Sequence, residues 1–492
     1  MESTQSRKDR QLPDLKKNYI YRLLYELTLL AGPLITVPYV SRVLGPTGVG
    51  DFSFTYSVAT YFILFCALGL SGYGTREISR CRDNEAAVSR LFWEIRLSGM
   101  IPGLICLVLW GIFILLTTRY KLLYLALTPY LLGAIFEIQW FYIGLEQVKD
   151  TALCGIGVRI LGIILTFLLI NDSGDTPIYC ALNSSIVLIT HLSMWLMLPK
   201  YLKKVSLKNI PVRKHLKETL VYFIPSIVMS IYMVLDKFLI GVITKNSCQN
   251  GYYEQADRVI SVTKTFVYWV MVNVASARMS YLYAQDRHDE IKSAISKSMD
   301  YIFFMGYGAV FGLLGISHNL VPIFFGPGYE PVEKLIWLML PLILIVSITN
   351  CLENYYYIPA GKRAQSTKYI LAGAILNLIM NICLIPFWGA DGAVMASLVA
   401  EVLIAVLFMI HCNSFLPPAL LGSLSVKRIL AGIPMAMAVW FTGKLAINGI
   451  AVLLIQMAAG VILYCLLLLM LRDSLITDVS NNLLDKIKKN KG

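Results

Sequence analysis

Long apolar stretches alternate with short polar ones along almost the whole chain of 492 residues. Each stretch has roughly 20 residues, the length that an α-helix needs to cross about 30 Å of hydrocarbon. The pattern predicts about fourteen membrane-spanning helices, at residues 19–43, 52–74, 93–117, 122–145, 151–170, 177–198, 218–244, 257–284, 299–325, 333–358, 368–388, 391–413, 428–447 and 450–471. Runs of this length exclude a transmembrane β-barrel, whose strands span only about ten alternating residues.

The composition agrees with a lipid environment. Hydrophobic residues make up 57% of the chain and charged residues only 15%, against about 25% charged residues in an average soluble domain. The net charge is +13, and no basic stripe interleaved with aromatic residues accompanies it. The excess is therefore interpreted as anchoring charge on cytoplasmic loops, and no nucleic-acid partner is expected.

The distribution of Lys and Arg predicts the orientation. With the N-terminus placed inside, 31 of the 43 basic residues fall on the inner side, 6 on the outer side and 6 within helices. This asymmetry predicts that both termini are cytoplasmic, with tails at 1–17 and 472–492. The first apolar run is too long for a signal peptide. The resulting localisation is a cell membrane crossed many times.

Enzymatic chemistry has no sequence signature here. The ten cysteines form no CxxC pair, and the five histidines lack metal-ligand spacing. The outer loops are too short to carry a catalytic site, and no DxD or DDxxD cluster occurs. We therefore expect no enzyme, no catalytic residues, no metal site and no cofactor other than a coupling ion.

The chain divides into two halves at its most basic loop, residues 200–217. This loop separates an N-terminal helix bundle (18–199) from a C-terminal one (218–413), which two further helices follow (414–471). A weak similarity links GPLITVPYVSRVLG in the first half to IPSIVMSIYMVLDKFLIGVIT in the second. Repeats of this kind are typical of transporters with a central site, although any polytopic protein can reuse Gly/Pro turns.

Charged residues within the apolar segments are the candidate site residues. A charge at the bilayer centre costs about 2.5–3.5 kcal/mol on insertion scales, so each needs a partner or a polar cavity. The cationic candidates for substrate binding are Arg42, Arg159, Lys237, Arg258, Lys264 and Arg278. The acidic candidates for coupling to H⁺ or Na⁺ are Glu26, Asp51, Glu137, Asp236, Glu353 and Glu401. Any single one has a structural ion pair as its alternative, but together they predict a cationic cavity for an anionic substrate such as a diphosphate.

The stretch VPYVSRVLGPTGVGDFSF places Arg42 and Asp51 on either side of a Gly/Pro cluster. The cluster predicts a tight outer turn from Gly45 to Gly50, because glycine tolerates unusual backbone angles. Arg42 just before it is expected to face the outer mouth of the cavity. The alternative is that Arg42 only extends its charged end to the membrane surface.

Several motifs resemble a known family. They are PYVSRVLGPTGVGDFSF, GLSGYGTREIS, IQWFYIGLEQVKD, ETLVYFIPSIVMSIYMVLDKFLIG, NGYYEQADRVI and YYYIPAGKRAQSTKYILAGAILNLIMNICLIPFWGADGAVMASLVAE. In this order and spacing they resemble Wzx-type oligosaccharide flippases of the MOP superfamily, over nearly the whole chain. The resemblance implies an all-α membrane fold, with two six-helix bundles around a cavity plus two C-terminal helices.

The same resemblance implies the activity. The expected substrate is an undecaprenyl-diphosphate-linked oligosaccharide, moved from the inner to the outer leaflet of the bacterial cytoplasmic membrane by ion-coupled alternating access. We expect a monomer, with cooperation with polymerase and chain-length proteins left open. The alternatives are a lipid II flippase, a drug or cation antiporter and, from another class, a membrane glycan polymerase or glycosyltransferase.

Overall fold

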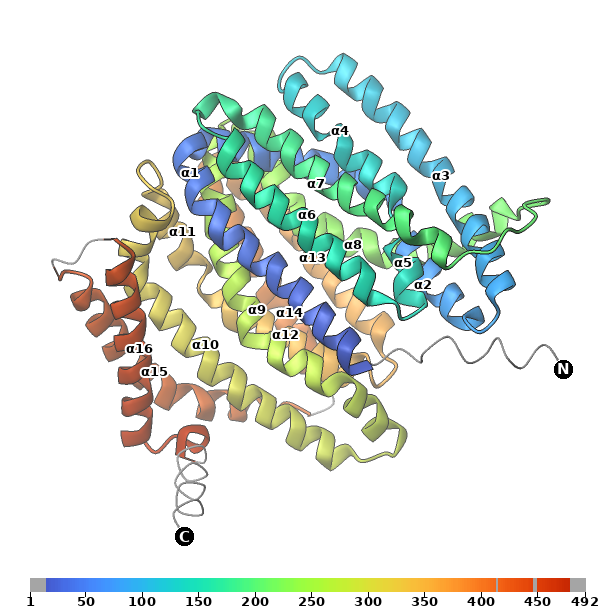
Figure 1. Ribbon diagram of the computed structural model, residues 1–492. Coiled ribbons are helices and arrows are strands. Elements are labelled where there is room, and N and C mark those ends of the chain that lie inside the picture. Colours follow the sequence, from blue (N-terminus) through green and yellow to red (C-terminus); the bar gives the residue numbers. More distant parts are fainter. Residues whose placement is uncertain (1–14, 413–414, 446–448, 478–492) are drawn as a thin grey trace, which may run out of the picture. The chain divides into compact units, whose positions relative to one another are not determined.

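The computed structural model describes residues 15–412, 415–445 and 449–477. These residues form helices joined by short connections, without a strand (Figure 1). Eleven helices or helix pairs among them are long and apolar enough to cross a membrane. The prediction of an all-α membrane protein is confirmed. The eleven count α1 and α2 as one span and do not include α8 or α9, which accounts for the difference from fourteen.

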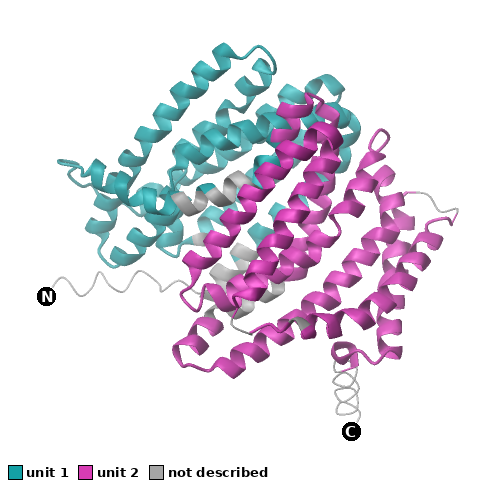
Figure 2. Ribbon diagram, turned by 180° about the vertical axis from the view of Figure 1, so that it is seen from behind, with its two compact units in different colours: residues 1–238 teal, residues 239–492 magenta. Residues whose placement is uncertain are grey.

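The chain forms two compact units, residues 1–238 and 239–492 (Figure 2). The division falls inside helix α8, beyond the predicted linker at 200–217. The predicted bundle boundaries are not tested by this division and stay predictions. Of the predicted tails, residues 1–14 and 478–492 lie outside the described part of the chain.

Unit 1 is built from α1 to α8, with two short 3₁₀ turns. Its helices are α1 (Leu15–Ala67), α2 (Leu70–Cys81), α3 (Glu85–Leu116), α4 (Lys121–Phe136), α5 (Gln139–Gly144), α6 (Val148–Leu169), η1 (Ser173–Asp175), α7 (Thr176–Met197), η2 (Leu198–Lys200) and most of α8 (Val212–Thr244). α4 packs against α7, and α1 packs against α3, α4 and α6.

Unit 2 holds the remaining helices. They are α9 (Ser247–Ala284), α10 (His288–Phe324), α11 (Pro331–Met339), α12 (Pro341–Leu352), the π-helical turn η3 (Glu353–Tyr357), α13 (Arg363–Trp388), α14 (Ala390–Ile410), α15 (Pro418–Thr442) and α16 (Ile450–Met470). α13 packs against α14, and α10 packs against α15. In η3 three consecutive tyrosines are buried, and the Tyr357 hydroxyl donates a hydrogen bond to the Phe408 carbonyl at 2.9 Å.

The predicted outer turn is a break of a single residue. Gly45 has φ 66° and ψ 178°, a conformation that only glycine adopts readily. Helical backbone resumes at once, with Pro46 in the first turn, where its missing N–H costs nothing. The prediction of a turn over Gly45–Gly50 is therefore wrong in extent, because α1 continues on both sides of Gly45.

A second break, at Gly69, positions α8. Gly69 has φ 74° and separates α1 from α2. A Cβ atom at this position would lie 2.6 Å from the backbone nitrogen of Phe223 and 2.8 Å from the carbonyl oxygen of Thr219. Only a residue without a side chain allows this part of α8 to approach the break so closely. The cytoplasmic end of α8, as the sequence predicts it, is thus fixed on unit 1.

Candidate functional site

The candidates on α1 lie on both sides of the Gly45 break. Arg42 is exposed three residues before it, and Asp51 is half-buried six residues after it. The backbone carbonyl of Asp51 accepts a hydrogen bond from the Thr55 hydroxyl at 2.7 Å. The structure thus keeps Arg42 and Asp51 at a common break in the helix, as the sequence predicts. Whether Arg42 binds substrate stays a prediction.

Two further candidates lie in the first half of α1 and on the part of α6 beside it. Glu26 is half-buried on α1, and Arg159 is half-buried on α6. The Arg159 guanidinium packs against the backbone of Gly32, where its Nε lies 3.3 Å from the position of an added Cβ atom. The absence of a side chain at Gly32 leaves room for this cation between α1 and α6.

The pair Asp236 and Lys237 lies on α8, beside the second half of α1. Asp236 is buried, and Lys237 is half-buried. The next residue, Phe238, places its ring 5.3 Å from the Tyr61 ring and 6.3 Å from the Phe54 ring. Within unit 1 the Phe238 ring therefore packs against the part of α1 that follows Asp51, and Tyr61 in that part is a residue on which the Asp236 charge acts.

In unit 2 the candidate cation Arg258 has a structural partner. The Nε atom of Arg258 lies 2.7 Å from the Glu254 carboxylate, one helical turn earlier on α9. This is the ion-pair alternative that the sequence left open for each charge. Of the other unit 2 candidates, the structure leaves one exposed (Arg278) and three half-buried (Lys264, Glu353 and Glu401).

Sequence reasoning missed two buried cations, Arg96 and Arg428. It counted both as loop residues, which the structure corrects: α3 begins at Glu85 and α15 at Pro418. Arg96 is thus eleven residues, or about 16 Å, into its helix. The sequence did contain one signal for their burial: each arginine stands near the start of a predicted apolar span. If the helix begins before that span, the arginine lies within the helix and can be buried.

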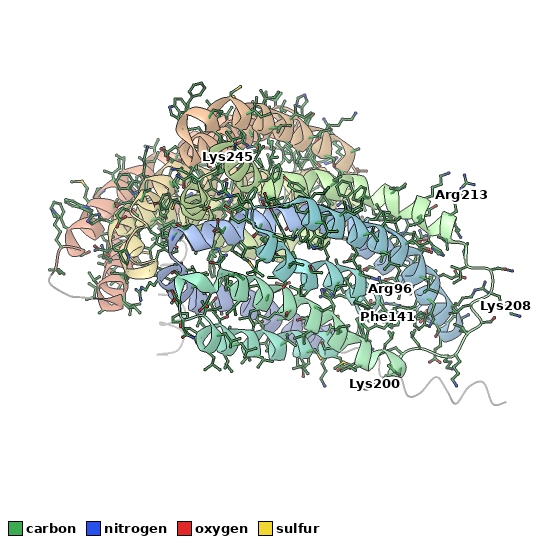
Figure 3. All side chains as sticks on the ribbon, turned by 90° about the horizontal axis from the view of Figure 1, so that it is seen from above. Arg96, Phe141, Lys200, Lys208, Arg213 and Lys245 are labelled. Carbon is green, nitrogen blue, oxygen red and sulfur yellow. The ribbon has the colours of Figure 1, made fainter. Side chains whose placement is uncertain are left out.

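Arg96 lies on α3 within unit 1 (Figure 3). The arginine is 1% exposed, and its guanidinium lies 5.9 Å from the ring centroid of Trp195. Its Nε and Nη2 atoms are buried without a hydrogen-bond partner among the described residues. Glu137 is the acidic residue whose charge acts on it.

Glu137 stabilises a break between α4 and α5. Residues 137 and 138 are not helical, and the Glu137 carboxylate accepts a hydrogen bond from the backbone N–H of Gln139 at 2.7 Å. This contact caps the first turn of α5. On the other side of the break, the Trp195 indole N–H donates to the Phe136 carbonyl at 2.8 Å. A broken membrane helix with a buried cation and an acid beside it is a typical feature of ion and substrate sites.

A buried histidine joins α8 to α2 and α3. The Nδ1 atom of His215 lies 2.8 Å from the Tyr73 hydroxyl, and its Nε2 atom lies 3.3 Å from the Glu94 carboxylate. Because a carboxylate only accepts, Nε2 carries the proton, and the Tyr73 hydroxyl donates to Nδ1. The neutral imidazole therefore satisfies both contacts.

We expect this His215 contact to weaken in acid. Burial lowers the pKa of His215; Lys214 lowers it further, and Glu94 and Glu77 oppose the shift. The native state thus favours neutral His215, so its stability is complete above the ordinary pKa of about 6.5 and is lost as the pH falls below it. Between pH 7.5 and 5.5, the thermal midpoint of the parent protein should fall more than that of His215→Gln. The control is His288→Gln, because His288 is exposed. An equal fall in thermal midpoint for the parent protein and His215→Gln would contradict the expectation.

Metal and disulfide chemistry find no support in the described part of the chain. No group of three or more His, Cys, Asp or Glu side chains there is placed to hold a metal ion. The ten cysteines are free thiols.

Known structures identify the fold class. The lipid II flippase MurJ, in an inward closed conformation, has a TM-score of 0.72 with 16% identity, covering 93% of this chain and 99% of the other. An inward-facing multidrug resistance MATE transporter has a TM-score of 0.58 with 14% identity, covering 79% and 95%. The chain therefore has the MOP-type fold, as the sequence predicts.

Sequence comparison identifies the family. Residues 15–281 match the sequence model described as "Polysaccharide biosynthesis protein", and the chain belongs to this family. An Escherichia coli K12 protein named "Putative O-antigen transporter" is 24% identical over 405 residues, which cover 81% of this chain and 97% of that protein. The predicted relationship to polysaccharide transporters rather than to enzymes is confirmed.

Proposed function

We propose that this protein is a flippase that moves undecaprenyl-diphosphate-linked oligosaccharide repeat units from the inner to the outer leaflet of a bacterial cytoplasmic membrane. The observation that carries the proposal is the match of residues 15–281 to the polysaccharide biosynthesis family. The MOP-type fold supports it, as does the similarity over 81% of this chain to the Escherichia coli K12 protein named "Putative O-antigen transporter". Cations inside membrane helices fit a diphosphate, since both Arg and Lys bind phosphate oxygens.

The proposed mechanism is alternating access, driven by H⁺ or Na⁺. The acidic residues Glu26, Asp51, Glu137, Asp236, Glu353 and Glu401 are the candidates for ion coupling, because acidic side chains within membrane helices often take part in proton or ion relays. The chain is proposed to act as a monomer in the bacterial inner membrane, with both termini cytoplasmic. Contact with polymerase and chain-length proteins is part of the same proposal.

Gene deletion with complementation tests the activity. We expect loss of surface polysaccharide and accumulation of complete lipid-linked units in the inner leaflet. Incomplete units, or single units already in the outer leaflet, would place the defect at an enzymatic step and overturn the proposal. Accumulation of lipid II instead would indicate a lipid II flippase.

Replacing Arg42 tests the proposed outer mouth of the path. Arg42→Ala is expected to lower export at least about tenfold, since a lost charge-assisted contact to phosphate is worth about 1.5–3 kcal/mol. Arg119→Ala is the matched control, because Arg119 is exposed on the same predicted side and rests on the Tyr120 ring at 4.6 Å. Export by quantitative complementation at equal membrane levels is the measurement. Normal export by Arg42→Ala would leave Arg42 as a residue that only reaches the membrane surface.

A further inference from the structure

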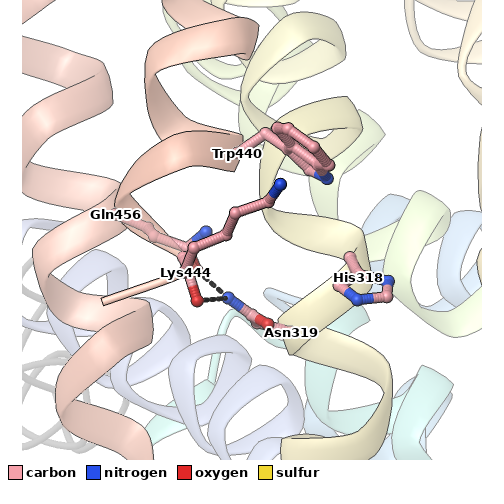
Figure 4. A pocket seen from close by; sticks show the side chains of 7 residues that line it. His318, Asn319, Trp440, Lys444 and Gln456 are labelled. Atoms are coloured by element: carbon pink, nitrogen blue, oxygen red, sulfur yellow. Dashed lines mark hydrogen bonds between the residues drawn. The ribbon is translucent and has the colours of Figure 1, made fainter. Parts of the chain in front are cut away.

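A small cavity lies where three helices of unit 2 meet, near the ends of α10 and α15 and the beginning of α16 (Figure 4). Its volume is about 130 Å³, and its lining includes His318, Asn319, Trp440, Lys444 and Gln456. Pockets for drug-sized ligands have volumes of about 300–1,000 Å³. The cavity is therefore too small for an oligosaccharide, but its size suits a phosphate group with a few attached atoms.

The base of the cavity is held by hydrogen bonds between its own amides. The Asn319 amide donates to the Gly443 carbonyl at 3.0 Å and to the Gln456 side-chain oxygen at 3.3 Å. Gln456, which is almost fully buried, donates in turn to the Val439 carbonyl at 2.8 Å. These bonds join the three helices, so the cavity is formed before any ligand arrives.

Lys444 supplies the charge. Its Nζ atom lies 3.7 Å from the ring centroid of Trp440, and no carboxylate among the described residues pairs with it. The nearby acid Glu333 faces His318 at 3.3 Å, and Lys334 pairs with Asp391. A lysine ammonium has three donors, and an aromatic ring occupies one face of it. Lys444 is thus ready to donate to an anionic oxygen.

The surface beside the cavity is apolar. Trp440 is 42% exposed, and Met437 and Phe441 on the same helix are also exposed. Tryptophan beside a lysine at the end of a membrane helix is typical of the bilayer interface. An amphiphile with its phosphate at Lys444 has apolar protein surface available for its acyl chains.

We propose that this cavity binds the phosphate headgroup of an anionic membrane lipid, with Lys444 as the anion-binding residue and Trp440 supporting it. In the predicted topology this end faces the outer leaflet. A soluble phosphate ester offers the same chemistry, and the adjoining apolar surface favours the lipid. The proposal concerns α10, α15 and α16 alone and is independent of the transported substrate.

Thermal unfolding of the purified full-length protein tests the site. Dioctanoyl phosphatidylglycerol, dioctanoyl phosphatidylcholine and glycerol 3-phosphate are titrated separately. We expect phosphatidylglycerol to raise the midpoint at the lowest concentration, because phosphatidylcholine carries a cation beside its phosphate. Lys444→Gln should require about tenfold more phosphatidylglycerol for the same rise in midpoint, because loss of one contact between charged groups weakens binding by about this factor. Lys444→Arg should restore the response.

The matched control is Lys121→Gln, an exposed lysine on the same predicted side in unit 1, which should respond as the parent does. Equal responses of the parent protein and Lys444→Gln would overturn the proposal, as would equal effects of the two lipids. A shift with glycerol 3-phosphate at the same concentration, lost in Lys444→Gln, would overturn the lipid as the source and assign the site to soluble phosphate esters.

Discussion

Replacing Arg428 with alanine is expected to lower the free energy of unfolding of unit 2 by about 3–5 kcal/mol, the usual cost of removing one partner from a buried ion pair. Arg428 on α15 is fully buried. It donates to both the backbone carbonyl and the carboxylate of Asp300 on α10, the former at 2.8 Å. It also meets the Asp473 carboxylate, just past α16, at 3.2 Å. A single guanidinium therefore connects α15 to α10 and to the chain after α16.

The effect of Arg428→Ala is measured as the thermal midpoint of the protein in detergent and as protease sensitivity after α14. Lys427→Ala is the matched control, since the exposed Lys427 donates to the Arg472 carbonyl. Its effect should stay within about 0.5 kcal/mol. A combined variant, Arg428→Met with Asp300→Asn and Asp473→Asn, should recover much of the loss, because no buried charge then lacks a partner. Equal effects of Arg428→Ala and Lys427→Ala would contradict this account.

The positions of the membrane helices along the chain were predictable because their signal is local. A run of about 20 apolar residues has few alternatives to a membrane helix, and the segments read from sequence correspond to α1 through α16. The breaks within helices were harder to predict from the sequence. The Gly/Pro cluster after Arg42 predicted a turn, but the chain needs only the unusual angles of Gly45 to change direction.

The candidate site was predictable only in part, because burial of a charge depends on helices distant in sequence. Arg258 has its partner Glu254 one turn away, a spacing that is visible in the sequence, although an ion pair was predicted only as a general alternative. Arg96 and Arg428 have no acidic residue three or four positions away in the sequence. They are buried because α3 and α15 begin about two to three turns before the apolar runs, and other helices then cover those turns.

Arg96→Met is expected to abolish most export, by at least about a hundredfold, while the protein stays as stable as the parent. The Nε and Nη2 atoms of Arg96 are buried without a hydrogen-bond partner among the described residues. Each buried unsatisfied group costs about 1–3 kcal/mol, so an apolar side chain of similar length should not destabilise the fold. The same change removes a buried cation whose charge acts on Glu137 at the α4–α5 break. Proteins tolerate such costly groups mainly where function uses them.

Two measurements on the same variants distinguish a functional from a structural role of Arg96. The thermal midpoint reports on stability, and complementation at equal membrane levels reports on export. Arg90→Met is the matched control, because Arg90 lies on the same helix but is exposed, with its Nε atom 2.8 Å from the half-buried Glu94 carboxylate. A pair whose cation is in solvent contributes little to stability, and Glu94 keeps its contact with His215. Both measurements should therefore match the parent. A stable Arg96→Met protein with normal export would exclude Arg96 from transport. An unfolded one would show that Arg96 acts through stability, with the Trp195 ring and Glu137 as its partners.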